Sequence, residues 1–193
     1  MVRRAILSVL TVGLALGLAN SAQASLKEFS TGTGSSQADL LFQFSDGAAY
    51  EFHVSYDSGI STGADLLDAV GNAFASSASG PVTVTLTHII DPTYGYDLQQ
   101  VTIVDNGVTH QDGIAGSSGG WDGSNYWAYW NRDTASSPWG YASTGASFRT
   151  IANGNGDAWY YSDGSTLPIP EPASLALLGL SGLVLVGRRS RRP

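Results

Sequence analysis

The residues of this chain that could do chemistry are few, and none of them completes a catalytic set. The segment Gly116-Ser117-Ser118-Gly119-Gly120 matches the Gly-x-Ser-x-Gly pattern around a nucleophilic serine. That pattern needs a strand before the serine and a helix after it, whereas this segment lies in a glycine- and serine-rich stretch. Hydrolases of that fold also place their histidine after the serine, and no histidine follows His110. The segment is therefore predicted to be a loop, not a nucleophile.

Residue types that usually hold metals are equally sparse. The three histidines, His53, His88 and His110, lie far apart in the sequence, and we interpret each as a structural or surface residue. The chain has no cysteine, which excludes disulfides, thiolate catalysis and cysteine-ligated metals. We therefore expect no resident metal and no cofactor.

One short segment has the spacing of a calcium loop. Asn153, Asn155 and Asp157 alternate as the first ligands of such a loop do, but Ala158 replaces its glycine and Gly164 its final glutamate. A turn between strands explains the segment better. A weaker alternative is loose calcium association by three loop carboxylates: Asp105, Asp112 and Asp122.

Aromatic residues are the most suggestive side chains of the domain. The segment 126–130 reads YWAYW, and in a strand its rings alternate between the two faces. We expect one set to be buried in the core, while the other could stack on sugar rings or on a planar ligand. The residues predicted for this platform are Tyr126, Trp127, Tyr129, Trp130 and Trp159. Core packing and a protein interface remain open alternatives.

The elements that must position these residues are mainly strands. Alternation or short apolar runs predict strands at 40–44, 50–56, 82–90, 101–104, 126–130, 139–141, 147–151 and 158–161. Residues 61–75 have helical periodicity, and Thr62 with Asp65 fits a capping box. Asp105-Asn106-Gly107 predicts a hairpin turn. The fold class is mainly β or α+β: a small antiparallel-sheet domain with one helix, arranged as a β-grasp or a sandwich.

The chain divides into four parts. Residues 1–24 have a basic start, an apolar run and a small-residue cleavage site, as a secretory signal peptide does. Ala22 and Ala24 mark that site, and cleavage is expected before Ser25. Residues 25–49 form a lead-in with the first strand, residues 50–167 a β-rich globular domain, and residues 168–193 a C-terminal tail. Within the lead-in, residues 30–37 are predicted to be a mobile linker because they are rich in Ser, Thr and Gly.

Charge is distributed unevenly among these parts. Residues 25–167 contain three basic residues, Lys27, Arg132 and Arg149, against fifteen acidic ones, which gives a formal net charge of −12. The whole-chain value of −7 hides this imbalance. A strongly anionic domain argues against binding nucleic acid, because a nucleic-acid site needs a basic footprint.

The tail has its own physical logic. Residues 173–187 carry no charge, and as a helix of about 1.5 Å per residue they barely span a hydrocarbon core of about 30 Å. The arginines behind them act as a positive-inside stop. Prolines before the apolar run hold the preceding segment extended and accessible. A permanent C-terminal anchor helix is the alternative to a processed signal.

The order of proline box, apolar run and basic cluster resembles the PEP-CTERM sorting signal of exported bacterial proteins. The residues that carry the sorting motif are Pro170, Glu171, Pro172, Ser174, Arg188, Arg189, Arg191 and Arg192. The resemblance implies an exosortase that removes or exchanges the tail, after the secretion machinery has exported the chain. It also implies transient anchoring in the inner membrane of a Gram-negative bacterium that makes exopolysaccharide. The mature protein would then lie in the periplasm, at the outer surface or in the extracellular matrix.

A second resemblance concerns the domain. The order of a helix after a strand, VTIVDNGV at 101–108, the aromatic strand, Gly145-Ala146, and residues 153–157 ahead of Trp159 and Tyr160 resembles the transcobalamin-like C-terminal domain. That resemblance implies a small β-grasp-related fold and allows a corrinoid-like ligand.

Together these patterns predict an exported, non-enzymatic protein associated with the surface or with an exopolysaccharide matrix. The alternatives are a small-ligand or carbohydrate-binding module and, in another class, a secreted hydrolase. A hydrolase would need a pair of Asp or Glu residues converging in a cleft, and the sequence singles out no such pair.

Overall fold

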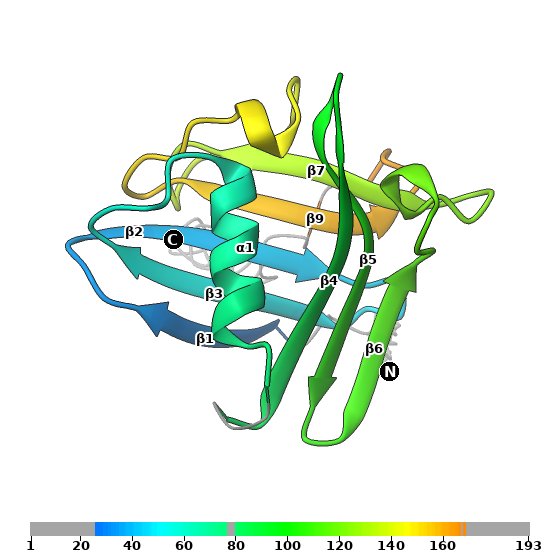
Figure 1. Cartoon of the computed structure of the whole chain (residues 1–193), viewed down its shortest axis with the longest axis horizontal. Helices are drawn as coiled ribbons and strands as arrows, with labels where there is room; N and C mark the ends of the chain where they lie inside the picture. Colours follow the sequence, from blue (N-terminus) through cyan, green and yellow to red (C-terminus); the bar gives the residue numbers. More distant parts are fainter. Residues whose placement is uncertain (1–25, 77–79, 167, 169–193) are drawn as a thin grey trace, which may run out of the picture.

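Two β-sheets and one helix build the domain. The computed structural model describes residues 26–76, 80–166 and 168, and Figure 1 shows the arrangement. The strands are β1 (Leu26–Gly32), β2 (Ser36–Gln43), β3 (Ala49–Tyr56), β4 (Val82–Asp91), β5 (Gly95–Asp105), β6 (Val108–Gly113), β7 (Tyr126–Arg132), β8 (Gly140–Tyr141) and β9 (Gly156–Ser162). The helix is α1 (Gly63–Ala73), and two short 3₁₀ helices are η2 (Ser118–Gly120) and η3 (Ala146–Phe148).

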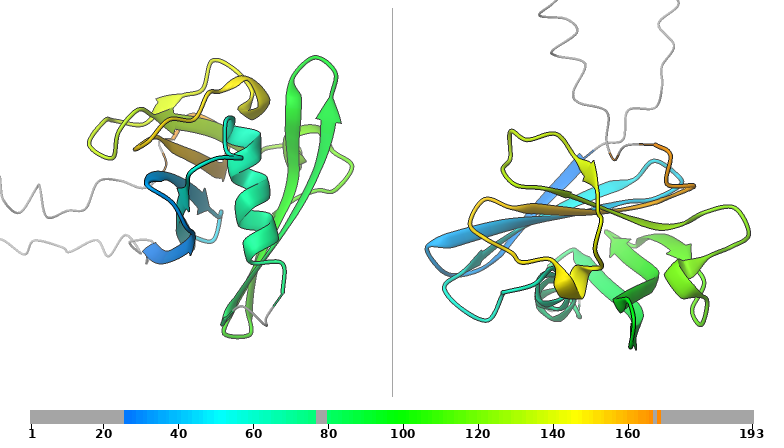
Figure 2. Two further views of the ribbon diagram at one scale, coloured as in Figure 1. Left: turned by 60° about the vertical axis from the view of Figure 1, so that its left-hand side comes forward. Right: turned by 90° about the horizontal axis from the view of Figure 1, so that it is seen from above.

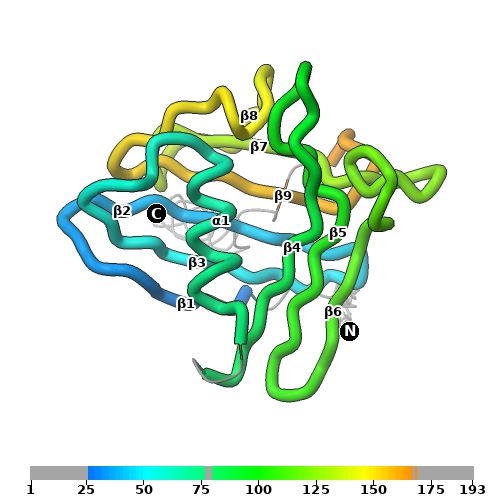
Figure 3. Tube along the Cα trace, in the orientation of Figure 1, coloured from blue at the N-terminus to red at the C-terminus, as the bar shows by residue number. Residues whose placement is uncertain are grey.

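The larger sheet has six strands in the order β1-β3-β2-β9-β7-β8; Figure 3 traces it to the short β8. The pairs β1–β3 and β2–β9 are parallel, and the other neighbours are antiparallel. The predicted class, a small mainly β domain with one helix, is therefore confirmed, although this sheet is mixed and not wholly antiparallel.

The second layer lies on one face of this sheet. It consists of α1 and the antiparallel sheet β4-β5-β6, which stand side by side in Figure 2. The core fills the space between the layers, with fully buried side chains from the large sheet, the helix and β5: Leu40, Phe42, Phe52, Leu66, Leu67, Val70, Leu98 and Ile103. Each such side chain stabilises the fold by about 1.5–3 kcal/mol through burial of apolar surface.

Local sequence signals set the ends of these elements. The Oγ1 of Thr62 accepts from the amide of Asp65 at 3.2 Å, and the Asp65 carboxylate accepts from the amide of Thr62 at 2.9 Å. The predicted helix and its capping box are thus confirmed. Asn106 and Gly107 both have positive φ values, 49° and 82°, as a two-residue hairpin turn requires. The turn between β5 and β6 is confirmed as well.

Two predictions about backbone structure are wrong. Residues 30–37, predicted to be a mobile linker, contain the end of β1 and the start of β2. Polar residues suffice there because β1 is an edge strand, which pairs with β3 alone among the described strands. Asp57 accepts hydrogen bonds from the amide and hydroxyl of Ser35. Residues 147–151, predicted to be a strand, begin in η3 instead, where the Ser147 hydroxyl accepts from the Tyr96 amide at 2.8 Å.

Several predicted features lie outside the described residues. They are the signal peptide with Ala22, Ala24 and Ser25, and the sorting residues Pro170, Glu171, Pro172, Ser174, Arg188, Arg189, Arg191 and Arg192. The predicted anchor helix belongs to the same part of the chain. Within the ranges that the structure describes, no helix combines the length and apolar character needed to cross a membrane.

Candidate functional site

A cleft of about 530 Å³ opens where the tip of the β4–β5 hairpin faces β7 and β9. Its size falls within the range of about 300–1,000 Å³ that is usual for small-molecule sites. We call it the aromatic cleft because seven rings line it: Tyr94, Tyr96, Trp121, Tyr126, Tyr129, Tyr141 and Trp159. Polar lining comes from Asp91, Asp97, Ser118, Ser143 and Thr144.

The floor of the cleft is a pair of stacked rings from neighbouring strands. Tyr129 of β7 and Trp159 of β9 are directly opposite in register. Their ring centroids lie 4.6 Å apart with an interplanar angle of 21°. The indole Nε1 of Trp159 is buried and has no hydrogen-bond partner among the described residues. Tyr129 and Trp159 are only 8% and 5% exposed, so that the floor presents little ring surface and contains a buried indole donor without a partner among the described residues.

The hydroxyl of Tyr129 is hydrogen-bonded to a buried ion pair between Asp157 and Arg149. This hydroxyl donates to Oδ2 of Asp157 at 2.5 Å, and Nε of Arg149 donates to Oδ1 of the same carboxylate at 3.1 Å. Burial raises the pKa of Asp157, and the hydrogen bonds from Tyr129 and Arg149 offset part of that rise. Burial and the neighbouring Asp157 raise the pKa of Tyr129 far above its usual value. Tyr129 thus keeps its proton as a donor to Asp157, which fixes the ring.

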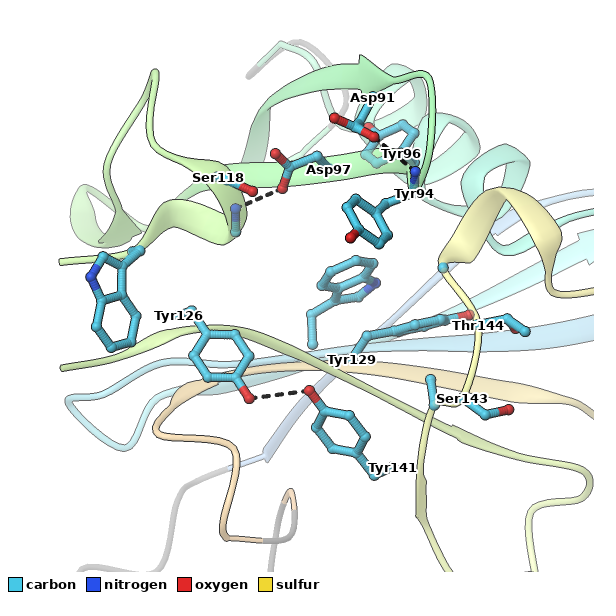
Figure 4. A pocket seen from close by; sticks show the side chains of 15 residues that line it. Asp91, Tyr94, Tyr96, Asp97, Ser118, Tyr126, Tyr129, Tyr141, Ser143 and Thr144 are labelled. Atoms are coloured by element: carbon cyan, nitrogen blue, oxygen red, sulfur yellow. Dashed lines mark hydrogen bonds between the residues drawn. The ribbon is translucent and has the colours of Figure 1, made fainter. Parts of the chain in front are cut away.

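The rim on the β7–β8 side carries exposed rings. Trp121 and Tyr141 are 48% and 54% exposed. Tyr126 contacts both of them. Its ring centroid is 6.3 Å from that of Trp121, and its hydroxyl oxygen is 3.1 Å from that of Tyr141. Figure 4 shows Tyr126 and Tyr141 on one side of the cleft. The rings of Trp121 and Tyr141 are thus accessible to a ligand in the folded domain, with no rearrangement of the backbone.

The opposite wall is the tip of the β4–β5 hairpin, and it is acidic. Oδ1 of Asp91 accepts from the amides of Thr93 and Tyr94 at 2.7 and 2.8 Å, which closes the turn. Oδ1 of Asp97 accepts from the amide of Gly119 at 2.6 Å, which ties the hairpin to η2. In both carboxylates the second oxygen, Oδ2, makes none of these bonds. Figure 4 shows both carboxylates on the wall across from Tyr126 and Tyr141.

Tyr96 connects this wall to the rest of the domain. Its hydroxyl donates to Asp68 of α1 at 3.2 Å, and its ring stacks on His88 with centroids 4.0 Å apart. Burial and the Asp68 carboxylate raise the pKa of Tyr96 well above its usual value. The wall is therefore anchored by hydrogen bonds to the helix and to η2.

The predicted ligand platform is only partly brought together. Tyr126, Tyr129 and Trp159 line the aromatic cleft. Trp127 instead lies in the main core, where its ring meets Phe44 edge-on at 5.6 Å. Trp130 lies on the other face of the sheet, 6% exposed, in a small second cluster. Trp127 and Trp130 are therefore packing residues in this structure.

Sequence reasoning missed the hairpin wall. Residues 91–100 were predicted neither as strand nor as turn, although Tyr94, Tyr96, Asp91 and Asp97 all come from them. The usable signal was Asp91-Pro92 followed by Gly95, a turn sequence between two polar-apolar alternating runs. That pattern would have placed a hairpin tip here.

The other chemical candidates have structural explanations. The hydroxyl of Ser117 donates to the Trp121 carbonyl at 2.9 Å, in a predicted loop that also contains the short 3₁₀ helix η2. His53 contacts Asp39, and His110 contacts Asp46, at 2.8 and 2.7 Å.

The segment with calcium-loop spacing is also engaged internally. Oδ1 of Asn153 accepts from the Gln37 amide at 2.8 Å, and Oδ1 of Asn155 accepts from the Ala152 amide at 2.8 Å. These bonds make it a turn that leads into β9, as predicted.

One group of side chains among the described residues has metal-like spacing. Glu28, Glu51 and His53 each bring one ligand atom within 4.8 Å of the others on the outer face of the large sheet. Arg132 already pairs with Glu51 at 3.0 Å, and Asp39 contacts His53. Because these contacts compensate the cluster internally, we assign no ion to it.

Comparison with known proteins adds one finding. A family model described as the PEP-CTERM protein-sorting motif matches residues 168–192. No curated protein and no solved structure matches this chain, and the resemblance to transcobalamin-like domains finds no support. The chain carries a PEP-CTERM sorting motif behind its β domain, which implies export, transient anchoring at the C-terminus and processing by an exosortase.

Proposed function

We propose that this protein is a non-enzymatic component of the cell surface or extracellular matrix that binds saccharides in the aromatic cleft. The sorting motif supports delivery through an exosortase. The observation that carries the binding function is the lining of the cleft: seven aromatic rings with carboxylates and hydroxyls among them. The exopolysaccharide of the producing cell is the partner that fits both features.

The chemistry of such a lining suits sugars. A pyranose presents an apolar C–H face that packs on an aromatic ring, while its hydroxyls need hydrogen-bond partners at the edge. The cleft offers both, because the exposed rings of Tyr94, Trp121 and Tyr141 line it and Asp97 and Ser118 lie on the wall. Ring surfaces fixed by packing lose little conformational entropy on binding, which favours affinity.

A secreted hydrolase is the second candidate, and one observation favours it. Asp91 and Asp97 are a pair of carboxylates in one cleft, which is the feature that the sequence could not single out. Glycosidases, however, place their two carboxyl groups on either side of the scissile bond. Asp91 and Asp97 come from the same hairpin and the same wall. This arrangement supports binding over hydrolysis.

A direct binding test separates these functions. The full-length protein in mild detergent is screened against immobilised oligosaccharides, and each bound oligosaccharide is then incubated with it and assayed for new reducing ends. Binding without new reducing ends is the expected result. Reducing ends that disappear in an Asp97→Asn variant would establish the hydrolase instead. Failure to bind any oligosaccharide would refute the saccharide-binding function.

The sorting part is tested by mass. The protein is recovered separately from membrane, outer-surface and medium fractions, and its intact mass is measured. We expect a chain that begins at Ser25 and ends near the Pro-Glu-Pro box, with any attached group visible as extra mass. A Glu171→Ala variant should accumulate in the inner membrane with its tail uncut. A wild-type chain still ending at Pro193 in that membrane would contradict processing.

A further inference from the structure

The charge of the aromatic cleft narrows the class of sugar that it can take. Asp91 and Asp97 line it, and Asp68 lies just behind Tyr96. Among the described residues that line the cleft, there is no lysine and no arginine. A ligand that enters therefore meets negative charge on one wall and no fixed positive charge.

The three basic side chains of the domain form ion pairs with carboxylates that do not line the cleft. Lys27 pairs with the buried Asp105. Arg132 pairs with Asp39 and Glu51 at 3.1 and 3.0 Å, on the outer face of the large sheet. Arg149 pairs with Asp157 at 3.1 Å beneath the cleft floor. None of the three is available to neutralise an anionic sugar without breaking an ion pair.

The rings add to the same preference. The face of an aromatic ring carries partial negative charge, so that a cation placed over it is attracted, most strongly over Trp and Tyr. Trp121 and Tyr94, which are 48% and 72% exposed, line the same cleft as the Asp97 carboxylate. Rings and carboxylates together make a site for a positively charged group.

We propose that the cleft selects saccharides that carry a protonated amine, such as oligomers of de-acetylated hexosamine, over their neutral N-acetylated counterparts. The ammonium group lies against the Asp97 and Asp91 carboxylates, and the pyranose ring packs on the exposed aromatic rings of the cleft. Uronic-acid sugars are disfavoured by the same carboxylates. This inference rests on the proposed saccharide-binding function and adds the charge class of the ligand to it.

Two matched probes test the inference. The β-1,4-linked tetramers of glucosamine and of N-acetylglucosamine share backbone and length and differ in the charge on nitrogen. Their affinities for the full-length protein are measured by titration calorimetry at about pH 6, where the amine is protonated, and at low and high salt. We expect the amine tetramer to bind about tenfold more tightly at low salt, and the preference to shrink as salt screens the charges.

Isosteric variants identify the groups responsible. Asp97→Asn and Asp91→Asn keep an oxygen that can accept from the Gly119 and Tyr94 amides and remove only the charge. Each should lower the affinity for the amine tetramer about three- to tenfold and should lower the affinity for the N-acetylated tetramer by a smaller factor. Asp57→Asn is the matched control, because Asp57 accepts the same kind of bond from Ser35 in an exposed turn away from the cleft.

The outcomes are distinguishable. Preference for the amine tetramer that both Asn variants reduce supports the inference. Equal affinities, or a preference for the N-acetylated tetramer, overturn the charge selection and leave saccharide binding standing. Absence of binding to either tetramer, together with a negative oligosaccharide screen, overturns both. A preference that the Asp57→Asn control reduces equally shows a general charge effect and also overturns the assignment to the cleft.

Discussion

Tyr129 lies flat against Trp159 while its hydroxyl reaches down to Asp157, so that one side chain belongs both to the cleft floor and to a buried ion pair. Its ring is 8% exposed and forms part of the cleft lining. Its hydroxyl keeps that surface in place, because Asp157 is fully buried and is held in turn by Arg149. Surface and support can therefore be separated by substitution.

Tyr129→Phe tests that separation. The variant keeps the stacked ring and removes the hydrogen bond, so that Asp157 loses a donor in a buried position. We expect the free energy of unfolding in urea to fall by about 1–3 kcal/mol, with little change in oligosaccharide affinity of the folded protein. Tyr94→Phe, at a site 72% exposed, is the stability control. A large loss of affinity with unchanged stability would show that the hydroxyl contacts the ligand instead.

Trp121→Ala tests the rim. Because Trp121 is half exposed, its removal should cost little stability but should weaken oligosaccharide binding about tenfold or more, through loss of one stacking surface. Phe148→Ala is the control, since Phe148 is 61% exposed and is not among the residues that line the cleft. Calorimetric titration of both variants measures the difference. Equal losses in the two would place the binding surface outside the cleft.

Gly120→Ala tests how tightly η2 is held against the cleft wall. Gly120 has φ +69°, and an added Cβ would lie 2.1 Å from the Gln99 carbonyl oxygen. We expect the free energy of unfolding to fall by more than about 3 kcal/mol, because the new Cβ forces the backbone to move and alanine is also strained at this φ. Gly116→Ala is the matched control: its φ is +87° but nothing lies within 4 Å, so only about 1 kcal/mol of strain is expected. Urea unfolding of both variants decides the point.

Asp65→Ala tests the helix cap and its pH dependence. Burial alone would raise the pKa of Asp65, but hydrogen bonds from Ser61 and Thr62 outweigh it and lower the pKa below 3.8. Stability that depends on the ionised carboxylate is therefore present above pH 3.8 and is lost as pH falls through the lower, folded-state value. Urea unfolding should show a deficit of about 1 kcal/mol at pH 7 that shrinks in acid. A deficit that stays constant down to pH 2 would contradict the ionised cap. Glu28→Gln controls for removing one charge.

The sequence predicts the elements well where local chemistry is decisive. The capping box at Thr62 and Asp65 and the turn at Asn106-Gly107 specify their structures through hydrogen bonds and φ values that few other sequences provide. The alternating pattern of residues 50–56 likewise predicts β3. These signals are short-range and are fully contained in the sequence.

What the sequence does not reveal is which residues meet. Tyr94 and Tyr126 lie more than thirty residues apart, and only the packing of the small sheet on the large one brings them to one cleft. The sequence shows which rings share a face of β7, but not that a second layer covers Trp127 while β8 and its neighbours cover Trp130. Burial of a ring depends on the layer above it, and local periodicity carries no information about that layer.

The position of β9 has a consequence for the life of the exported chain. β9 lies inside the large sheet, between β2 and β7, yet it is the last strand of the described residues and ends at Ser162, six residues before the sorting motif begins. During export the N-terminus crosses the membrane first. The large sheet therefore cannot be completed until β9 has crossed, when translocation is almost finished. Transient anchoring at the C-terminus therefore coincides with the last step in building the large sheet, the insertion of β9 between β2 and β7.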